Sequence, residues 1–586
     1  MSWEMAIASV VTTTSWYSPP LVPGSCSRKP WNPYPKSLSI RFNARRGRLK
    51  LRAQRSLALD AEKEWENGRT VDVAVIGAGI GGLCCAAMLA KYGLSVVVCE
   101  SHDTAGGAAH AFIRQGFHFD SGPSFHAGLS TKPSINPLKQ VLDAIDEQVQ
   151  CVQYDTWIGY FPEGIFKFTA DKAAYAAEIT RVGGQKAGCE WKELERAMEP
   201  FSRAAASLPA AALRQDLGVL LTVGRFLPRL LPYIPYTGSL LAPFSDMVDK
   251  IVKDPFLRKL IDLECFVLSG LLADGTITAE MTTMFMERHR ADGTIDYPLG
   301  GGQSIIEALL RGLRKYGGQV LLSSHVDKII TQDGRAVGIE FRKTRGPGKG
   351  EKMVLNARKA VVSNASVWDT ARLLPDNEQF HSRAVSIPKT DSFMHLHLGI
   401  EASGLPDDLE CHHLVLNDWS VGINAPQNVC IVSIPTVFDP SLAPPGHHVV
   451  HAYTAGNEPY DIWRGMDQKS AEYATQKEVR SEVLWKALEK VIPDIRRRVK
   501  LKLVGSPLTH ERYLRRSEGT YGPAIKAGEM SFPGPQTNIP GLICCGDSTM
   551  PGIGVPAVAA SGLIAAHSIV PVWDQLRLLN SIGDAI

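Results

Sequence analysis

The pattern with the clearest chemical meaning is a glycine-rich turn, Gly77-Ala78-Gly79-Ile80-Gly81-Gly82. In such a turn the first glycine allows a tight bend, the second lets the backbone approach a pyrophosphate, and the third lets a helix pack closely on a sheet. The free N–H groups that open the helix attract phosphate. Glu100 lies eighteen positions after Gly82, where a carboxylate can accept hydrogen bonds from a ribose. The spacing predicts a dinucleotide site.

Two later segments decide between NAD and FAD, which the turn alone leaves open. Gly106 and Gly107 follow Glu100, and an apolar run at 541–545 leads into Gly546-Asp547. A second glycine turn, which contains Gly554, Val555 and Pro556, then opens a helix of small residues. A carboxylate at the end of a strand, beside a helix N-terminus, suits a sugar-alcohol chain and a nearby phosphate or ring carbonyl. These segments favour FAD.

The remaining reactive side chains form no recognisable catalytic group. No Ser-His-Asp or Cys-His arrangement is detectable. His395 and His397 are two positions apart in a predicted strand and share one face, so they line either a substrate cavity or the polar face of a sheet. Adjacent histidine pairs at 412–413 and 447–448 point in opposite directions and lack acidic ligands at suitable spacing. We therefore predict no metal site.

The hydrophobic pattern predicts the elements that hold the first turn. Residues 71–76 form an apolar run interrupted only by Asp72, which is typical of a buried strand. A helix rich in Ala and Leu continues to about Tyr92, and a second strand at 95–100 follows. Together these elements make a βαβ unit, which places the turn at the carboxyl end of the first strand.

Further along the chain, residues 150–290 have a helical pattern, and alternation at 393–398 predicts a strand. The apolar stretch at 217–236, broken by prolines, is either an interfacial patch with basic anchors or a set of helices packed inside a domain. Residues 548–573 lack Asp, Glu, Lys and Arg, but Pro551 and Pro556 would break a spanning helix. No transmembrane span is predicted.

The charge of the chain is unevenly distributed. Residues 1–59 hold ten Lys or Arg and one acid, Glu4, whereas the other residues hold 53 basic and 59 acidic side chains. The leader is also rich in Ser and Arg, which predicts a cleavable plastid transit peptide. The alternative is a basic tail that binds acidic surfaces. The mildly acidic remainder gives no reason to expect nucleic-acid binding.

Taken together, these motifs resemble the FAD-binding signature of the amine-oxidase and phytoene-desaturase superfamily. The likeness continues through Gly519-Thr520-Tyr521-Gly522-Pro523 and spans about 71–570. Within the superfamily the chain is most similar to the carotenoid isomerases of plants and cyanobacteria. The resemblance implies an α/β fold: a doubly wound, Rossmann-type FAD-binding domain assembled from discontinuous segments, with an inserted α+β substrate domain.

The resemblance also implies an organisation along the chain. We expect a disordered transit peptide at 1–59, FAD-binding segments at 71–150, 296–380 and 511–570, a membrane-facing helical domain at 151–295, and a substrate-domain sheet at 381–510.

The family pattern implies roles for individual residues. Gly77, Gly79 and Gly82 would hold the FAD pyrophosphate, with Gly106 and Gly107 beside it. Glu100 would bind the adenosine ribose, and Val326 would meet the adenine through its backbone. At the other end of the cofactor, Gly546-Asp547 would contact the ribityl chain, and Gly554, Val555 and Pro556 would approach the flavin ring. Many members have Arg where this chain has Ala108, which removes one phosphate or flavin contact. His110 receives no role.

The function implied by the resemblance is cis–trans isomerisation of a long apolar polyene, in which reduced flavin transiently donates electrons and the cofactor, not a side chain, carries the chemistry. The partners would be a hydrophobic isoprenoid or carotenoid and, peripherally, a plastid membrane. Two alternatives remain open: an FAD-dependent desaturase or saturase, and a non-catalytic isoprenoid escort protein of the same fold.

Overall fold

The predicted glycine turn joins the first strand and first helix of a mixed seven-stranded sheet. The computed structural model describes residues 66–122, 124–290, 295–346 and 348–583, so the predicted transit peptide lies outside the described residues. β1 (Thr70–Ile76), α3 (Ile80–Lys91) and β2 (Val96–Cys99) form the βαβ unit, with β1 parallel to β2. The predicted unit is confirmed, with element ends shifted by one residue.

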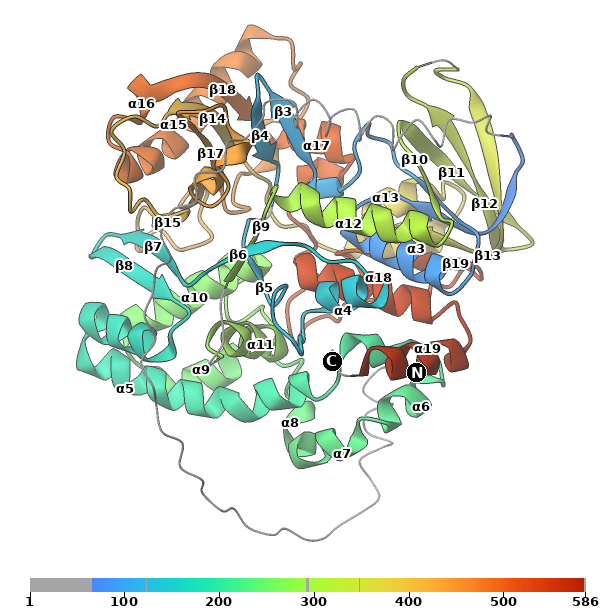
Figure 1. Ribbon diagram of the computed structural model, residues 1–586, viewed down its shortest axis with the longest axis horizontal. Helices are drawn as coiled ribbons and strands as arrows, with labels where there is room; N and C mark the ends of the chain where they lie inside the picture. Colours follow the sequence, from blue (N-terminus) through green and yellow to red (C-terminus); the bar gives the residue numbers. More distant parts are fainter. Residues whose placement is uncertain (1–65, 123, 291–294, 347, 584–586) are drawn as a thin grey trace. The chain divides into compact units, whose positions relative to one another are not determined.

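The other strands of this sheet come from distant parts of the chain. They are β10 (Gln319–Leu321), β11 (Ser324–Gln332), β12 (Arg335–Lys343), β13 (Lys352–Ser363) and β19 (Leu542–Cys544). The order is β10-β2-β1-β13-β12-β11, with β19 also paired to β13 (Figure 1). β10, β2, β1, β13 and β19 pair in parallel, whereas β11 and β12 are antiparallel.

Parallel pairing brings four strand ends to one edge of the sheet. Ile76, the last residue of β1, lies opposite Cys99 of β2 and Ser363 of β13, and Ser363 lies opposite Cys544 of β19. The residues that follow these ends therefore meet, although β13 and β19 are hundreds of positions from β1 and β2 in the sequence. In open α/β sheets this carboxyl edge is where ligands bind.

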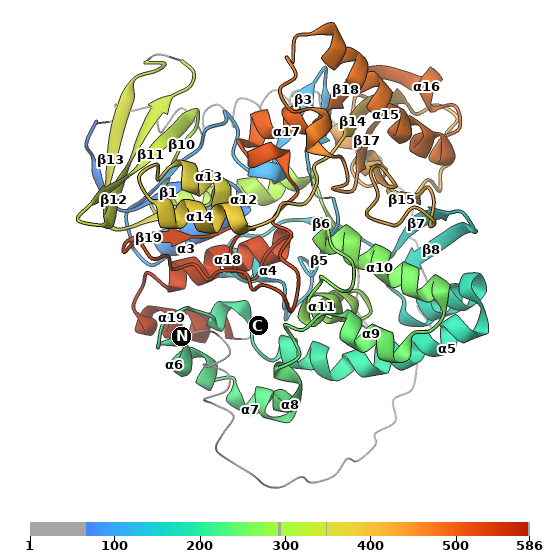
Figure 2. The same ribbon diagram turned by 180° about the vertical axis from the view of Figure 1, so that it is seen from behind.

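Helices α3 and α18 (Val555–His567) pack against each other beside this edge (Figures 1 and 2). Both consist mostly of small or aliphatic buried residues. At their crossing Gly562 is so close to α3 that a Cβ atom there would lie 2.2 Å from the carbonyl oxygen of Gly81. The close approach depends on glycine, as expected for a tightly packed internal helix.

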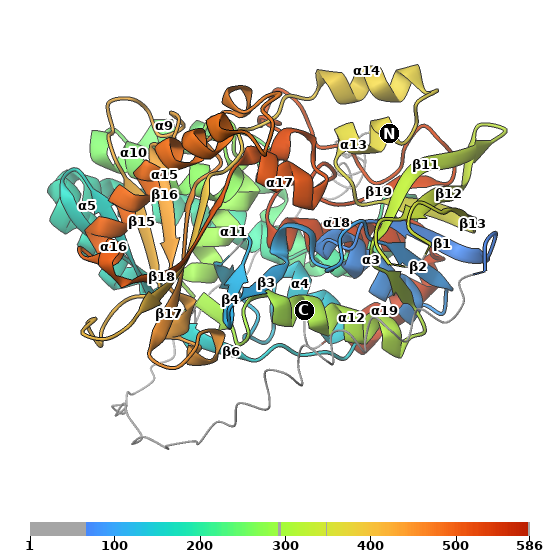
Figure 3. The same cartoon turned by 90° about the horizontal axis from the view of Figure 1, so that it is seen from above.

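A second sheet carries the predicted histidine pair. Its order is β18-β14-β17-β16-β15-β7-β8. The strands are β7 (Thr156–Phe161), β8 (Gly164–Thr169), β14 (His395–Glu401), β15 (His412–Leu416), β16 (Val429–Ser433), β17 (His447–Thr454) and β18 (Val499–Gly505). Helix α15 (Ala471–Val491) packs on one face, and α17 (Pro507–Leu514) lies between the two sheets (Figures 1 and 3).

Successive side chains of β14 point to opposite faces, as its alternation predicted. Leu396 and Leu398 belong to the apolar cluster that includes Trp485 of α15. His395 and His397 therefore point to the other face, away from α15.

The expectation of a helical pattern from residue 150 is wrong for 151–169. These residues form β6 (Cys151–Tyr154), β7 and β8. β7 pairs in parallel with β15, a long-range contact that local periodicity does not reveal. The helices begin afterwards: α5 (Lys172–Ala206), α6 (Val219–Gly224), α7 (Leu227–Leu230), α8 (Ile234–Thr237), α9 (Ser245–Ile251), α10 (Pro255–Ser269) and α11 (Thr278–Arg288).

Among the described residues, no helix is both long and apolar enough to cross a membrane. The predicted apolar stretch at 217–236 is divided into α6, α7 and α8, each of at most six residues. Its large side chains are unusually accessible: Leu217 is 74% exposed and Leu221 52%. The expectation of no spanning helix agrees with this finding.

We predict that Gly562→Ala destabilises the fold by about 2–3 kcal/mol, because the added methyl group must force α3 and α18 apart. Gly224→Ala is the matched control, since a Cβ atom on this helical glycine meets nothing within 4 Å. Urea unfolding of both variants measures the difference. Equal midpoints for the two variants would show that the α3–α18 crossing is not tightly constrained.

Candidate functional site

One asparagine joins the two glycine motifs at the carboxyl edge of the first sheet. Asn364 directly follows β13, and its backbone N–H donates to the carbonyl oxygen of Ile76 at 2.9 Å. A Cβ atom on Gly79 would lie 2.8 Å from Asn364 Nδ2, and one on Gly81 or Gly546 would lie 2.7 or 2.9 Å from its Oδ1. The amide therefore fills the space that these glycines leave open.

Sequence reasoning missed Asn364, because no motif surrounds it. The only available signal was its position directly after an apolar strand, and that strand must first be placed beside β1 before the signal has meaning.

The predicted neighbourhood of Gly106 and Gly107 is present in the structure. Gly79 and Gly106 form an isolated parallel bridge, and the N–H of Gly106 donates to Ala78 at 2.8 Å. A Cβ atom on Gly107 would lie 3.1 Å from Gly79 Cα. Both Gly106 and Gly107 have positive φ angles, which favour glycine. The two segments thus lie backbone against backbone beside the start of α3.

Glu100 holds the other side of the turn. Its Oε2 accepts the N–H of Ala78 and its Oε1 accepts that of His102, both at 2.7 Å. Burial raises the pKa of this carboxyl, and the two N–H donors oppose that shift. The backbone of Glu100 also bonds to Leu321 and Ser324, so β11, with Val326 at its third position, begins beside it. Glu100 and the first residue of β11 are therefore hydrogen-bonded to each other.

Asp547 follows β19 and forms an ion pair with Arg516. Arg516 also donates to the carbonyl oxygens of Thr520 at 2.5 Å and Tyr521 at 2.9 Å. Arg516 therefore connects Asp547 to the motif at residues 519–523, a role that the sequence did not indicate. The preceding residue, Gly546, donates its N–H to Ser561 of α18 at 3.1 Å.

Gly554 precedes the first residue of α18, with Val555 and Pro556 in the first turn of that helix. Gly554 has a φ of 102°, and a Cβ atom there would meet nothing within 4 Å, so the glycine is required by its conformation and not by crowding. The N-terminus of α18 thus lies in the same short segment as Asp547. The cofactor roles of these residues remain predictions.

His110, which had no predicted role, fastens the double-glycine segment. Its Nδ1 lies 2.8 Å from the Gly107 carbonyl oxygen and 2.9 Å from Ser121 Oγ. Burial lowers the pKa of His110 to about 4, so the imidazole is neutral at physiological pH. This side chain holds Gly107 against the end of β4 (Phe117–Asp120).

His395 and His397 lie on one face of β14, as predicted. Both side chains are buried, and a third histidine lies beside them. His451 of β17 lies directly opposite His397 in the antiparallel ladder. Burial lowers the pKa of His397 to about 4 and that of His395 and His451 well below the usual range. The face is therefore uncharged at neutral pH, and the substrate-cavity role of His395 and His397 stays a prediction.

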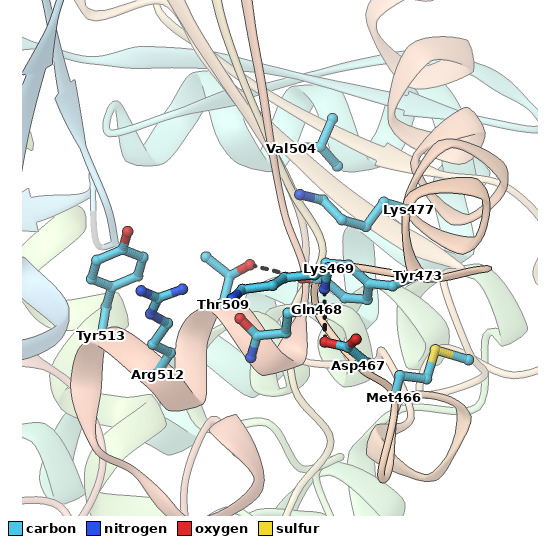
Figure 4. A pocket seen from close by; sticks show the side chains of 10 residues that line it. All are labelled: Met466, Asp467, Gln468, Lys469, Tyr473, Lys477, Val504, Thr509, Arg512 and Tyr513. Atoms are coloured by element: carbon cyan, nitrogen blue, oxygen red, sulfur yellow. Dashed lines mark hydrogen bonds between the residues drawn. The ribbon is translucent and has the colours of Figure 1, made fainter. Parts of the chain in front are cut away.

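A surface hollow of about 680 Å³ is separate from the motif residues (Figure 4). Figure 4 shows Lys477 and Arg512 pointing into it. It is lined by Met466, Asp467, Gln468, Lys469, Tyr473, Lys477, Val504, Thr509, Arg512 and Tyr513. Because this lining is largely polar and basic, the hollow does not suit a hydrocarbon, and we assign it no part in the site.

The sequence matches the flavin containing amine oxidoreductase family over residues 80–570. It is 34% identical to prolycopene isomerase 1, chloroplastic, of Oncidium hybrid cultivar, with 88% of both chains covered. It is 33% identical to prolycopene isomerase, chloroplastic, of Daucus carota, with 93% of this chain and 91% of that one covered.

Among solved structures, an oxidoreductase from Methanosarcina mazei superposes with a TM-score of 0.54 at 20% identity, covering 84% of this chain and 98% of that one. This likeness and the family match confirm the predicted FAD-binding α/β fold.

The protonation of buried histidines predicts lower stability in acid. Burial lowers the pKa to about 3 or about 4 for His110, His126, His397, His412, His413, His510 and His567. Unfolded histidines take up protons near pH 6.5, so stability present above that pH is lost as the pH falls toward 4. Asp120 and Glu280, whose pKa values burial raises to about 7, act in the opposite direction but are outnumbered.

We expect the apparent melting temperature to be about 5–10 °C lower at pH 5 than at pH 7. Differential scanning fluorimetry in buffers of equal ionic strength measures this. A melting temperature that stays level or rises would mean that the histidines are not held neutral by burial.

Proposed function

This chain belongs to the flavin containing amine oxidoreductase family, and from that premise we propose that it is an FAD-dependent carotenoid cis–trans isomerase. The observation that carries the proposal is the identity of 33–34% to two prolycopene isomerases, which extends along about nine-tenths of each chain. Identity over this length includes the second sheet as well as the cofactor motifs, so it favours a shared substrate class and not only a shared cofactor.

The cofactor of the chain is FAD, and the described residues fit it. Gly79, Gly106 and Gly107 carry no side chains of their own, so their backbones approach one another closely, and a pyrophosphate binds to backbone of this kind. The positive end of the α3 dipole stabilises the phosphates. We assign the ribose to Glu100, whose carboxylate accepts the N–H of Ala78 in the glycine turn, and the ribityl chain to Asp547, whose carboxylate is paired with Arg516.

When bound and reduced, FAD supplies electron density that lowers the order of a polyene double bond and permits rotation. The side chains of this protein would hold in place the segments that surround the cofactor. Arg516 fixes Asp547 and the 519–523 segment, and Asn364 fixes the glycine turns against each other. Neutral imidazoles on the second sheet present no net charge to a hydrocarbon, and the surrounding apolar residues exclude water.

The hydrophobic substrate would come from a plastid membrane, to which the protein binds peripherally. Both isomerases above are named chloroplastic, and the leader at 1–59 has transit-peptide composition. Leu217, Leu221 and Leu231 are each more than half exposed, with Arg225 and Arg229 nearby in sequence. Exposed leucines with basic neighbours favour an interfacial patch, because arginine attracts anionic headgroups while leucine enters the acyl region. We propose no nucleic-acid partner.

We predict that Asp547→Ala weakens FAD binding at least about tenfold, because it removes a charged acceptor and leaves Arg516 without its partner. Asp376→Ala is the matched control, since its carboxylate is 87% exposed and lies at the surface. Flavin absorbance per protein after gel filtration measures retention, with circular dichroism to confirm folding. Full flavin retention by a folded Asp547→Ala variant would remove the ribityl role.

The reaction itself is tested by incubating the photoreduced protein anaerobically with a panel of cis-carotenoids. We expect products of unchanged mass with a shifted absorption band, separated by chromatography. A mass gain of two hydrogens would instead indicate a saturase. In a parallel incubation with the oxidised flavoprotein, which can accept two electrons, a mass loss of two hydrogens would indicate a desaturase. A colourless protein that binds carotenoids without converting them would indicate an escort protein.

A further inference from the structure

Three buried histidines from two neighbouring strands converge on one face of the second sheet. His395 and His397 belong to β14, and His451 of β17 lies opposite His397. Each offers a ring nitrogen, and these three nitrogens all lie within 4.8 Å of one another. The side chains are 7%, 6% and 3% exposed. In the part of the chain that the structure describes, no other group of His, Cys, Asp and Glu side chains meets these criteria.

The distances between the rings suit a shared ion. His395 Nδ1 and His451 Nε2 are 3.0 Å apart. Two nitrogens bound tetrahedrally to one zinc ion, each at about 2.0–2.1 Å, would be separated by about 3.3 Å. His397 Nε2 lies 3.3 Å from the carbonyl oxygen of Asp120, which leaves its Nδ1 for a ligand. Metal-binding histidines commonly use their second nitrogen in this way, and the carbonyl then fixes the ring orientation.

Hydrogen bonding alone does not account for the cluster. If His395 and His451 share one proton between Nδ1 and Nε2, the other nitrogen of His395 is still buried with no hydrogen-bond partner among the described residues. Protein interiors rarely leave such an atom unpaired, because its lost hydration is not compensated. Hydrogen bonds therefore leave the imidazole of His395 incompletely satisfied, and an ion bound by this ring would give it a further partner.

We propose that His395, His397 and His451 bind one divalent transition-metal ion. The donor set is imidazole only, which selects ions such as Zn²⁺, Cu²⁺ and Ni²⁺ over Mg²⁺ and Ca²⁺, since the latter require oxygen ligands. Three histidines leave a fourth position for water or another ligand. His510 stays outside the set, because it is not one of the three histidines whose ligand nitrogens all lie within 4.8 Å of one another.

Binding requires a small rearrangement. The rings of His397 and His451 are stacked at 4.2 Å with only 8° between their planes. An ion lies close to the plane of each imidazole that binds it, so one of these rings must turn about its Cβ–Cγ bond. His451 is the ring that turns, because the Asp120 carbonyl already orients His397, and this turn replaces the present 3.0 Å contact between His451 and His395. The bound ion then joins β14 and β17, so it stabilises the sheet.

This site goes beyond the proposed function, and its test needs no isomerase activity. The full-length protein with FAD, purified without a histidine tag, is treated with a chelator, reloaded with Zn²⁺ and desalted. Mass spectrometry of the metal then gives the stoichiometry, and zinc X-ray absorption counts the ligands. We expect one zinc per chain with three imidazole nitrogens at about 2.0–2.1 Å, and a higher melting temperature after loading.

Variants identify the ligands. We expect His397→Ala and His451→Ala each to retain less than a tenth of an equivalent. His413→Ala should keep the full equivalent, because His413 is a buried histidine of β15 outside the cluster. FAD content and circular dichroism report folding, and His451→Gln, which preserves volume, replaces an alanine variant that does not fold.

The proposal is overturned if the wild-type chain binds less than about a tenth of an equivalent of Zn²⁺, Cu²⁺ and Ni²⁺. It is equally overturned if folded His397 and His451 variants bind as much metal as wild type, or if X-ray absorption finds no imidazole ligands.

Discussion

The structure depends on how closely backbone approaches backbone at the carboxyl edge of the first sheet. Gly81 of α3 is so close to Gly546 and α18 that a Cβ atom on it would lie 3.2 Å from Gly546 Cα, 3.1 Å from the Val558 carbonyl oxygen and 2.7 Å from Asn364 Oδ1. The approach is possible because β13 lies between β1 and β19, so the segments that follow all three strands emerge side by side. A Cβ atom at any of these glycines would separate the segments that must grip one cofactor.

The same constraint explains why polar groups cluster at this edge. The buried carboxylate of Glu100 accepts the backbone N–H of Ala78 in the glycine turn and that of His102 after β2. Arg516 satisfies another set of polar groups, because it pairs with the carboxylate of Asp547 and donates hydrogen bonds to two backbone carbonyl oxygens. A buried site can tolerate such charges only where each one is paired or hydrogen-bonded. Each charged group named here therefore has partners within the protein itself.

Because successive side chains of a strand point to opposite faces, the two faces of the second sheet differ in chemistry. One face of β14 is aliphatic and packs on α15, whereas the other presents His395 and His397 to His451. Because burial keeps these imidazoles neutral, the face can adjoin an apolar substrate without the cost of a buried charge. The neutral imidazole is also the form that binds transition metals. A bound ion would add charge to this face, so the uncharged contact with an apolar substrate applies to the face without metal.

The sequence alone determined what depends on near neighbours: the βαβ unit around Gly77–Gly82, the carboxylate at Glu100, the Gly546-Asp547 step and the alternation of β14. It predicted helices where β7 forms, because the pairing of β7 with β15 comes from a distant part of the chain. It gave no sign of Asn364, Arg516 or the meeting of His451 with His397, and its prediction of no metal site considered only local spacing. Strand order and register decide these contacts, and both are set by the packing of the whole chain.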